Sequence, residues 1–127
     1  MQVDRRHGVP REIGKIAEDE ACRYLQHRGL KLVARNYHCR CGEIDLIMKE
    51  AETLVFVEVR YRRNPQFCSG AETVDLRKQQ KLISTALFYL QQHGRQAQPP
   101  ARFDVISMSR RADETVINWI QDAFQMA

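Results

Sequence analysis

The sequence has no apolar run that approaches the roughly 20 residues needed by a membrane-spanning helix. Its first residues are polar and basic, and no apolar stretch of the secretory-signal type follows them. Internal repeats, low-complexity tracts and linker-like stretches are lacking as well. We therefore expect a cytoplasmic protein that does not enter a membrane, with a flexible arm over residues 1–10 and a single domain over residues 11–127.

Cysteine is present but not in the spacing of a disulfide framework or a zinc site. The four cysteines include no Cys-x-x-Cys pair, and a chain of 127 residues needs no disulfide staples. His38, Cys39 and Cys41 stand close together, yet the other histidines fit no familiar zinc spacing. Reduced thiols are therefore expected, and a structural zinc is not favoured.

Acidic residues are outnumbered by basic ones. The chain has 20 Lys and Arg against 16 Asp and Glu, which gives a formal net charge of +4. Basic surface attracts polyanions through Coulomb steering and counterion release. The charge balance favours a nucleic-acid partner, although many proteins that bind no nucleic acid are equally basic.

Apolar periodicity predicts an alternation of helices and strands. A three- and four-residue spacing predicts an amphipathic helix over residues 11–28, ended by Gly29, and a second helix over residues 73–93. A loop is predicted between these helices over residues 62–72, and the runs rich in β-forming residues predict strands over 30–37, 42–49, 53–61, 102–108 and 115–120.

Two acidic residues, Asp45 and Glu58, stand inside runs that are otherwise apolar enough to be buried strands. A hairpin loop at residues 51–52 would set Asp45 opposite Glu58 and Ile47 opposite Phe56. Opposed Cβ atoms lie about 4.5 to 5.5 Å apart, so both carboxylates would reach one cation. Because an unpaired buried carboxylate costs several kcal/mol, the pattern indicates either a divalent-metal site or a buried ion-pair network.

Strand alternation places Glu43 and Arg60 on the same predicted face as Asp45 and Glu58. Glu43 is a weaker site candidate because it begins its strand, where water reaches it. Asp104 is also weaker, because it has the alternative of capping or of pairing with an arginine on a neighbouring strand.

The order helix, three strands, helix, strand, with acids on the second and third strands, resembles the PD-(D/E)XK, or restriction-endonuclease-like, nuclease superfamily. More closely, the chain resembles the uncharacterised YraN family, usually described as similar to Holliday-junction resolvases, in the runs E-D-E-A-C-R-Y-L (18–25), G-E-I-D-L-I (42–47), F-V-E-V-R-Y-R (56–62) and R-F-D-V (102–105). The resemblance implies an α/β fold with a restriction-endonuclease-like αβββαβ core, in which helices flank a mixed central sheet.

The resemblance also implies a site. Asp45 matches the superfamily's metal-binding aspartate, Glu58 the first acid of its E-x-K element, and Glu18 the extra glutamate of resolvase-like members; the expected cofactor is Mg²⁺ or Mn²⁺. For Glu18, a solvated position on its helix is the alternative. The match departs at Arg60, where lysine is usual, because arginine stays charged and would stabilise a transition state without exchanging its proton. Lys78, on the second helix, would bring an ammonium to the site from another direction.

Basic residues from several segments are the predicted nucleic-acid rim: Arg35, Arg40, Arg62, Arg63, Arg77 and Lys81. A scattered basic surface is the alternative. The resemblance implies a metal-dependent endonuclease that acts on structured or branched DNA, and a homodimer, since resolvase-like proteins are commonly dimers. Two other functions stay open: a nuclease fold that binds nucleic acid or a partner without turnover, and an interaction protein with no nucleic-acid role.

Overall fold

The computed structural model describes residues 11–62, 74–93 and 99–126. Its element order, α then three β then α then two β, contains the predicted αβββαβ core and confirms the predicted fold class. The predicted arm over 1–10 and most of the predicted loop over 62–72 lie outside the described residues. The elements are α1 (Arg11–His27), β1 (Lys31–Cys39), β2 (Gly42–Glu50), β3 (Thr53–Arg62), α2 (Leu76–His93), β4 (Ala101–Arg111) and β5 (Glu114–Phe124).

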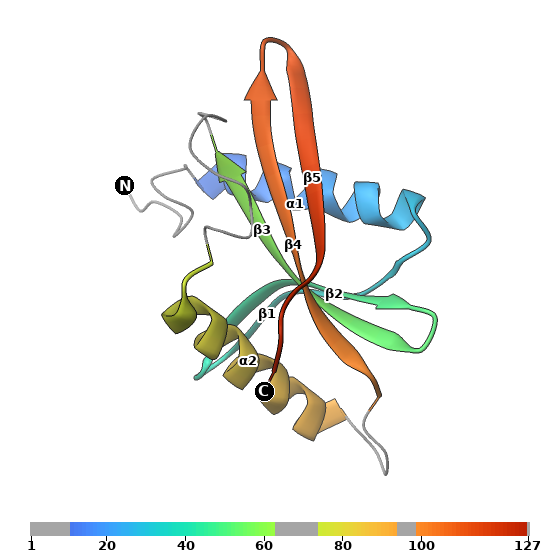
Figure 1. The fold of residues 1–127 in the computed structure, drawn as a ribbon, viewed down its shortest axis with the longest axis vertical. Helices are drawn as coiled ribbons and strands as arrows, with labels where there is room; N and C mark the ends of the chain where they lie inside the picture. Colours follow the sequence, from blue (N-terminus) through green and yellow to red (C-terminus); the bar gives the residue numbers. More distant parts are fainter. Residues whose placement is uncertain (1–10, 63–73, 94–98, 127) are drawn as a thin grey trace.

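The strands form one five-stranded sheet in the order β1-β2-β3-β4-β5. β3 and β4 are parallel and the other neighbours are antiparallel, so the sheet is mixed, as expected. The parallel pair requires a crossover, and α2 makes it. Figure 1 shows that the β4–β5 hairpin extends beyond the end of β3 and past α1.

Each helix covers one face of the sheet, because alternate strand residues belong to two separate cores. On the α1 side, Leu46 and Val57 pack with helix residues such as Leu25. On the α2 side, Ile47 and Phe56 pack with helix residues such as Leu82 and Tyr89. The central strands β2, β3 and β4 therefore form a buried layer between the two helices (Figure 1).

α1 ends in a Schellman motif, as the glycine after its last turn predicts. Gly29 has a φ of 96° and donates its N–H to the Gln26 carbonyl at 3.1 Å. The Leu30 N–H reaches back to the Leu25 carbonyl at 3.1 Å, and both leucine side chains are buried in the same core. This turn sets the direction in which the chain enters β1.

α2 begins at Leu76, and its N-cap is Asp75. The Asp75 carboxylate accepts a hydrogen bond of 2.8 Å from the Lys78 backbone N–H, the usual role of an aspartate at this position. The predicted start at residue 73 lies outside the described residues. The cap fixes the first turn of α2, which carries Lys78 toward the sheet.

The β2–β3 hairpin has the predicted register. Ile47 pairs with Phe56 and Glu50 pairs with Thr53, so residues 51 and 52 form the two-residue loop. Ala51 has a φ of 52°, as the first residue of such a tight loop requires. In the described part of the chain, neither helix is long and apolar enough to cross a membrane.

Candidate functional site

Asp45 lies where β2 and β3 separate. The ladder between these strands ends at the pair Leu46 and Val57, one step before the predicted pair of Asp45 and Glu58. There the Asp45 Oδ2 atom accepts a hydrogen bond of 2.9 Å from the Val59 backbone N–H. A side-chain oxygen thus accepts the hydrogen bond that a backbone carbonyl would otherwise accept. This bond holds the buried Asp45 carboxylate beside Val59, the residue that follows Glu58.

The side-chain alternation of β2 breaks at the same place. Ile44 and Ile47 both pack in the α2-side core, although strict alternation would put them on opposite faces. On β1, Asn36 has a φ of 51°, a conformation that asparagine tolerates better than most residues. The prediction that Glu43, Asp45 and Ile47 share one face is therefore wrong at Glu43. The Glu43 Oε2 atom lies 3.1 Å from Nδ1 of the exposed His38.

Glu58 is contacted by cations from two layers of the fold. Its Oε2 atom lies 3.5 Å from Arg60 Nη1 on the same strand and 3.1 Å from Lys78 Nζ on α2. Glu58 and Arg60 are 2% and 4% exposed, whereas the Lys78 side chain is 19% exposed. Burial lowers the pKa of the Arg60 guanidinium, and the nearby Glu58 and Asp45 carboxylates oppose that shift.

Glu18 approaches the sheet from α1. It is buried, and its Oε1 atom lies 4.0 Å from Arg35 Nη2. The same Arg35 nitrogen lies 2.6 Å from Asp19 Oδ1. Glu58, in contrast, is a residue of β3 that meets Lys78 of α2, so the two glutamates have different helices as neighbours.

The donor set at Asp45 and Glu58 suits a hard divalent cation. Across residues 11–62, 74–93 and 99–126, no group of three or more His, Cys, Asp or Glu side chains is placed to hold one metal ion. A closed cage that includes Glu18 is therefore not assembled there. Mg²⁺ and similar ions, however, bind through one or two carboxylates and keep several waters, and two buried carboxylates on adjacent strands fit that requirement.

The predicted basic rim divides into three groups. Arg40, Arg77 and Lys81 are exposed, Arg35 and Arg62 are partly buried, and Arg63 lies outside the described residues.

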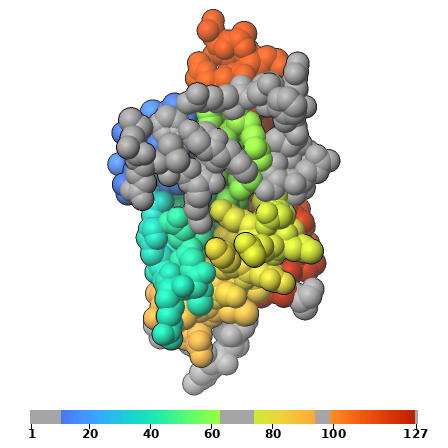
Figure 2. All heavy atoms as spheres, turned by 90° about the vertical axis from the view of Figure 1, so that its left-hand side faces the viewer, coloured from blue at the N-terminus to red at the C-terminus, as the bar shows by residue number. Residues whose placement is uncertain are grey.

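The start of β2 packs directly against α2. A Cβ atom at Gly42 would lie 3.0 Å from Thr85 Oγ1 and 3.9 Å from the Lys81 carbonyl oxygen. Figure 2 shows this end of the β1–β2 hairpin beside α2, with the end of β3 above them.

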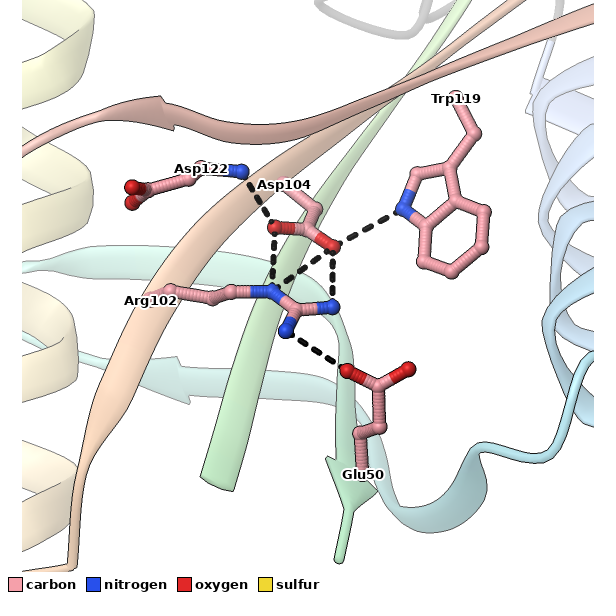
Figure 3. A network of polar contacts seen from close by, with 5 residues as sticks. All are labelled: Glu50, Arg102, Asp104, Trp119 and Asp122. Carbon is pink, nitrogen blue, oxygen red and sulfur yellow. Dashed lines mark hydrogen bonds and ion pairs between the residues drawn. The ribbon is translucent and has the colours of Figure 1, made fainter.

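Asp104 belongs to a different polar network (Figure 3). Its carboxylate accepts hydrogen bonds from Arg102 Nε at 3.0 Å, from Trp119 Nε1 at 2.9 Å and from the Asp122 backbone N–H at 2.9 Å. Arg102 Nη1 in turn contacts Glu50 Oε1 at 2.7 Å. Asp104 thus pairs with an arginine on its own strand, not on a neighbouring one as predicted, and the network ties the edge strand β5 to β4 and β2.

The element order and the mixed sheet define the class of this protein: an α/β protein with the αβββαβ core that the sequence resemblance implies. The family profile described as "Uncharacterised protein family UPF0102" matches residues 17–108. The chain belongs to this family, which agrees with the resemblance to YraN.

Relatives in the family are similar over nearly their whole length. A UPF0102 protein of Nitrosococcus oceani is 48% identical over 116 residues, which cover 91% of this chain and 94% of that protein. A UPF0102 protein of Methylobacillus flagellatus is 51% identical over 114 residues, which cover 90% of this chain and 97% of that protein. A third, from Stutzerimonas stutzeri, is 48% identical over 112 residues, which cover 88% of this chain and 93% of that protein.

The chain is also distantly similar to a solved structure. The structure of Pyrococcus furiosus SfsA in complex with Ca²⁺ matches with a TM-score of 0.35 and 14% sequence identity. The match covers 90% of this chain and 64% of that chain. A likeness at this level says nothing about activity.

Proposed function

We propose that this protein is a metal-dependent endonuclease that acts on structured or branched DNA, with Mg²⁺ or Mn²⁺ as its cofactor. One observation carries the proposal: Lys78 Nζ lies 3.1 Å from Glu58 Oε2. The superfamily that the chain resembles has a lysine two residues after this glutamate, where this chain has Arg60. Lys78 supplies an ammonium beside the same carboxylate from α2.

Each residue has a distinct part in the proposed site. Asp45 and Glu58 would hold the cation, which when bound acidifies a water and orients it toward a phosphodiester. Arg60 is a fixed cation with two parallel donors, so it suits the extra negative charge that develops on the phosphate oxygens in the transition state. The exposed part of the Lys78 side chain allows its ammonium to move between Glu58 and a bound phosphate.

The buried position of the acids supports this assignment. Charges act more strongly on one another in a site that excludes water than they do at the surface. Asp45 is also oriented, because Val59 donates its backbone N–H to Oδ2. A preset carboxylate needs little reorganisation when it binds a cation, which is the arrangement that catalysis requires.

A cleavage assay tests the proposal. Purified protein should nick a four-way DNA junction with Mn²⁺, and Asp45→Asn or Glu58→Gln should reduce the rate by at least about 100-fold. Glu43→Gln is the matched control, since Glu43 is an acid on the same strand that contacts His38, and it should keep the rate within about twofold. If the wild type nicks no linear, branched or flapped DNA, or if Asp45→Asn nicks at the wild-type rate, the proposal is wrong.

The second candidate function is nucleic-acid binding without turnover. It is favoured by the contacts of Glu58 with two cations, Arg60 and Lys78, which is also how a purely structural ion-pair network is built. This alternative predicts DNA binding that weakens with salt and survives Asp45→Ala. The slope of log affinity against log salt would report the number of phosphates engaged.

A further inference from the structure

The β4–β5 hairpin continues the sheet beyond the end of β3. Arg62, the last residue of β3, pairs with Ser109. β4 runs on to Arg111, and β5 begins at Glu114, so the tip has no β3 residue beside it. Figure 1 shows this tip extending past the rest of the described molecule, on the side where β3 ends. The hairpin therefore starts next to the proposed site and leads away from it.

The two faces of the hairpin differ in chemistry. Ile106 and Met108 pack in the α1-side core, so Arg110 follows them on that face. Ser107, Ser109 and Arg111 lie on the other face of the hairpin. On β3, Arg60 pairs with Ser107 and Arg62 pairs with Ser109, so these two arginines belong to the same face.

The cross-strand partners extend this second face. Asn118 lies opposite Ser107, Val116 opposite Ser109, and Glu114 opposite Arg111. The α2-side core of β4 contains Phe103 and Val105 but not the next residues on that face, Ser107 and Ser109, which are only partly buried. We call the polar residues of this face the hairpin strip: Arg62, Ser107, Ser109, Arg111 and Asn118.

The hairpin strip is rich in hydrogen-bond donors that suit phosphate. Guanidinium, hydroxyl and amide groups are among the side-chain groups that contact DNA phosphates. Arg62 is partly buried, and its Nε atom is buried without a hydrogen-bond partner among the described residues. One acid on the same face, Glu114, faces Arg111 and partly cancels its charge.

We propose that the hairpin strip binds the sugar–phosphate backbone of duplex DNA that leads away from the cleavage site. The inference rests on the proposed function, because it takes the Glu58 and Arg60 end of β3 as the place where a phosphodiester reacts. The strip begins at Arg62, two residues after Arg60 on the same strand, and continues along the hairpin to Arg111. A duplex held along it would have its backbone oriented relative to Glu58.

Two adjacent arginines provide a matched test. Arg110 and Arg111 are both exposed at the tip, but their side chains lie on opposite faces. The affinity for a fluorescein-labelled 20-base-pair duplex is measured by anisotropy in EDTA at about 0.1 M salt, so that no cleavage occurs. Loss of one phosphate contact should weaken binding about 5- to 10-fold in Arg111→Gln and reduce the salt slope by about one. Arg110→Gln should stay within about twofold of the wild type.

A charge change on the opposite strand checks the same face from the other side. Glu114→Gln removes the acid that opposes Arg111, and it should strengthen binding about two- to threefold because a like charge is no longer near the phosphates. If Arg110→Gln and Arg111→Gln bind equally well, the hairpin strip is not the contact surface even though the protein binds DNA. If the wild type binds no duplex at all, this inference fails, whereas the proposed function is decided separately by the nicking assay on the four-way junction.

Discussion

Two buried carboxylates in neighbouring strands are held in different ways. Asp104 is fixed by donors from its own part of the sheet, including the Trp119 indole N–H at 2.9 Å and the Asp122 backbone N–H at 2.9 Å. Glu58 meets two side-chain cations, and one of them, Lys78, belongs to another layer and is partly exposed. The contacts of Glu58 at 3.1 and 3.5 Å are also longer than those that hold Asp104 to β5.

The difference separates a structural acid from a candidate functional one. A carboxylate that also accepts hydrogen bonds from an indole and a backbone N–H of the adjacent strand is locked in place, and its contribution is to stability. A carboxylate that shares its charge with a partly exposed lysine of another layer, beside the arginine on its own strand, can exchange the lysine for a metal ion or a phosphate. The three predictions below test this contrast on the free energy of unfolding, from the largest expected effect to the smallest.

Asp104→Ala should lower the free energy of unfolding by about 3 kcal/mol, because it leaves the Trp119 indole N–H and Arg102 Nε without their acceptor, and Arg102 keeps its contact with Glu50. Urea denaturation measures the change. Asp104→Asn should lose less, since it keeps one acceptor oxygen. DNA affinity per folded molecule should not change. A loss below about 0.5 kcal/mol for Asp104→Ala would show that the network in Figure 3 does not stabilise the fold.

Glu58→Gln should cost about 1 to 2 kcal/mol in the same measurement. The loss is smaller than for Asp104→Ala because the Lys78 ammonium can turn toward water, and because the negative charge of Asp45 still balances the positive charge of Arg60. The variant should nonetheless lose metal-dependent nicking, which Asp104→Asn should retain. A destabilisation as large as that of Asp104→Ala would place Glu58 in the structural class and contradict the contrast.

Lys78→Met should change the free energy of unfolding by less than about 1 kcal/mol, because Arg60 still faces the Glu58 carboxylate and because the Lys78 side chain is partly exposed. The methionine keeps the apolar stem of the side chain packed on the sheet. The nicking rate, measured on the same four-way junction, should fall at least about 10-fold. Lys49→Met, at an exposed position near the hairpin end of β2 and outside the predicted rim, is the control and should keep the rate within about twofold.

Much of the fold was predictable from local signals. A two-residue loop sets the pairing of a hairpin, so residues 51 and 52 sufficed to predict that Ile47 faces Phe56. Gly29 predicted the end of α1 for the same kind of reason, since a glycine accepts the φ that a Schellman motif needs. Asp45 and Glu58 were found because acids in apolar strands are costly to bury.

What the sequence could not predict depends on contacts between distant segments. Strict alternation put Glu43 on the same face as Asp45 and Glu58. The irregularity at Asn36 and Asp45 moves Glu43 to the other face. The sequence of β2 does not reveal this, because Asn36 belongs to the neighbouring strand β1. The partners of Asp104 come from β5, where Asp122 adopts a φ of 53° at a register shift. The sequence did contain a signal for the pair of Arg102 and Asp104, because residues two positions apart in a strand lie on the same face.

Metal binding by calorimetry tests the central claim most directly, because it asks whether Asp45 and Glu58 form a cation site and Asp104 does not. Mn²⁺ is titrated into the wild type, Asp45→Asn and Asp104→Asn, each first checked for a cooperative unfolding transition. We predict saturable binding by the wild type and by Asp104→Asn, and loss of that binding in Asp45→Asn. Equal Mn²⁺ binding by the wild type and Asp45→Asn, or no binding by the wild type, would contradict the account.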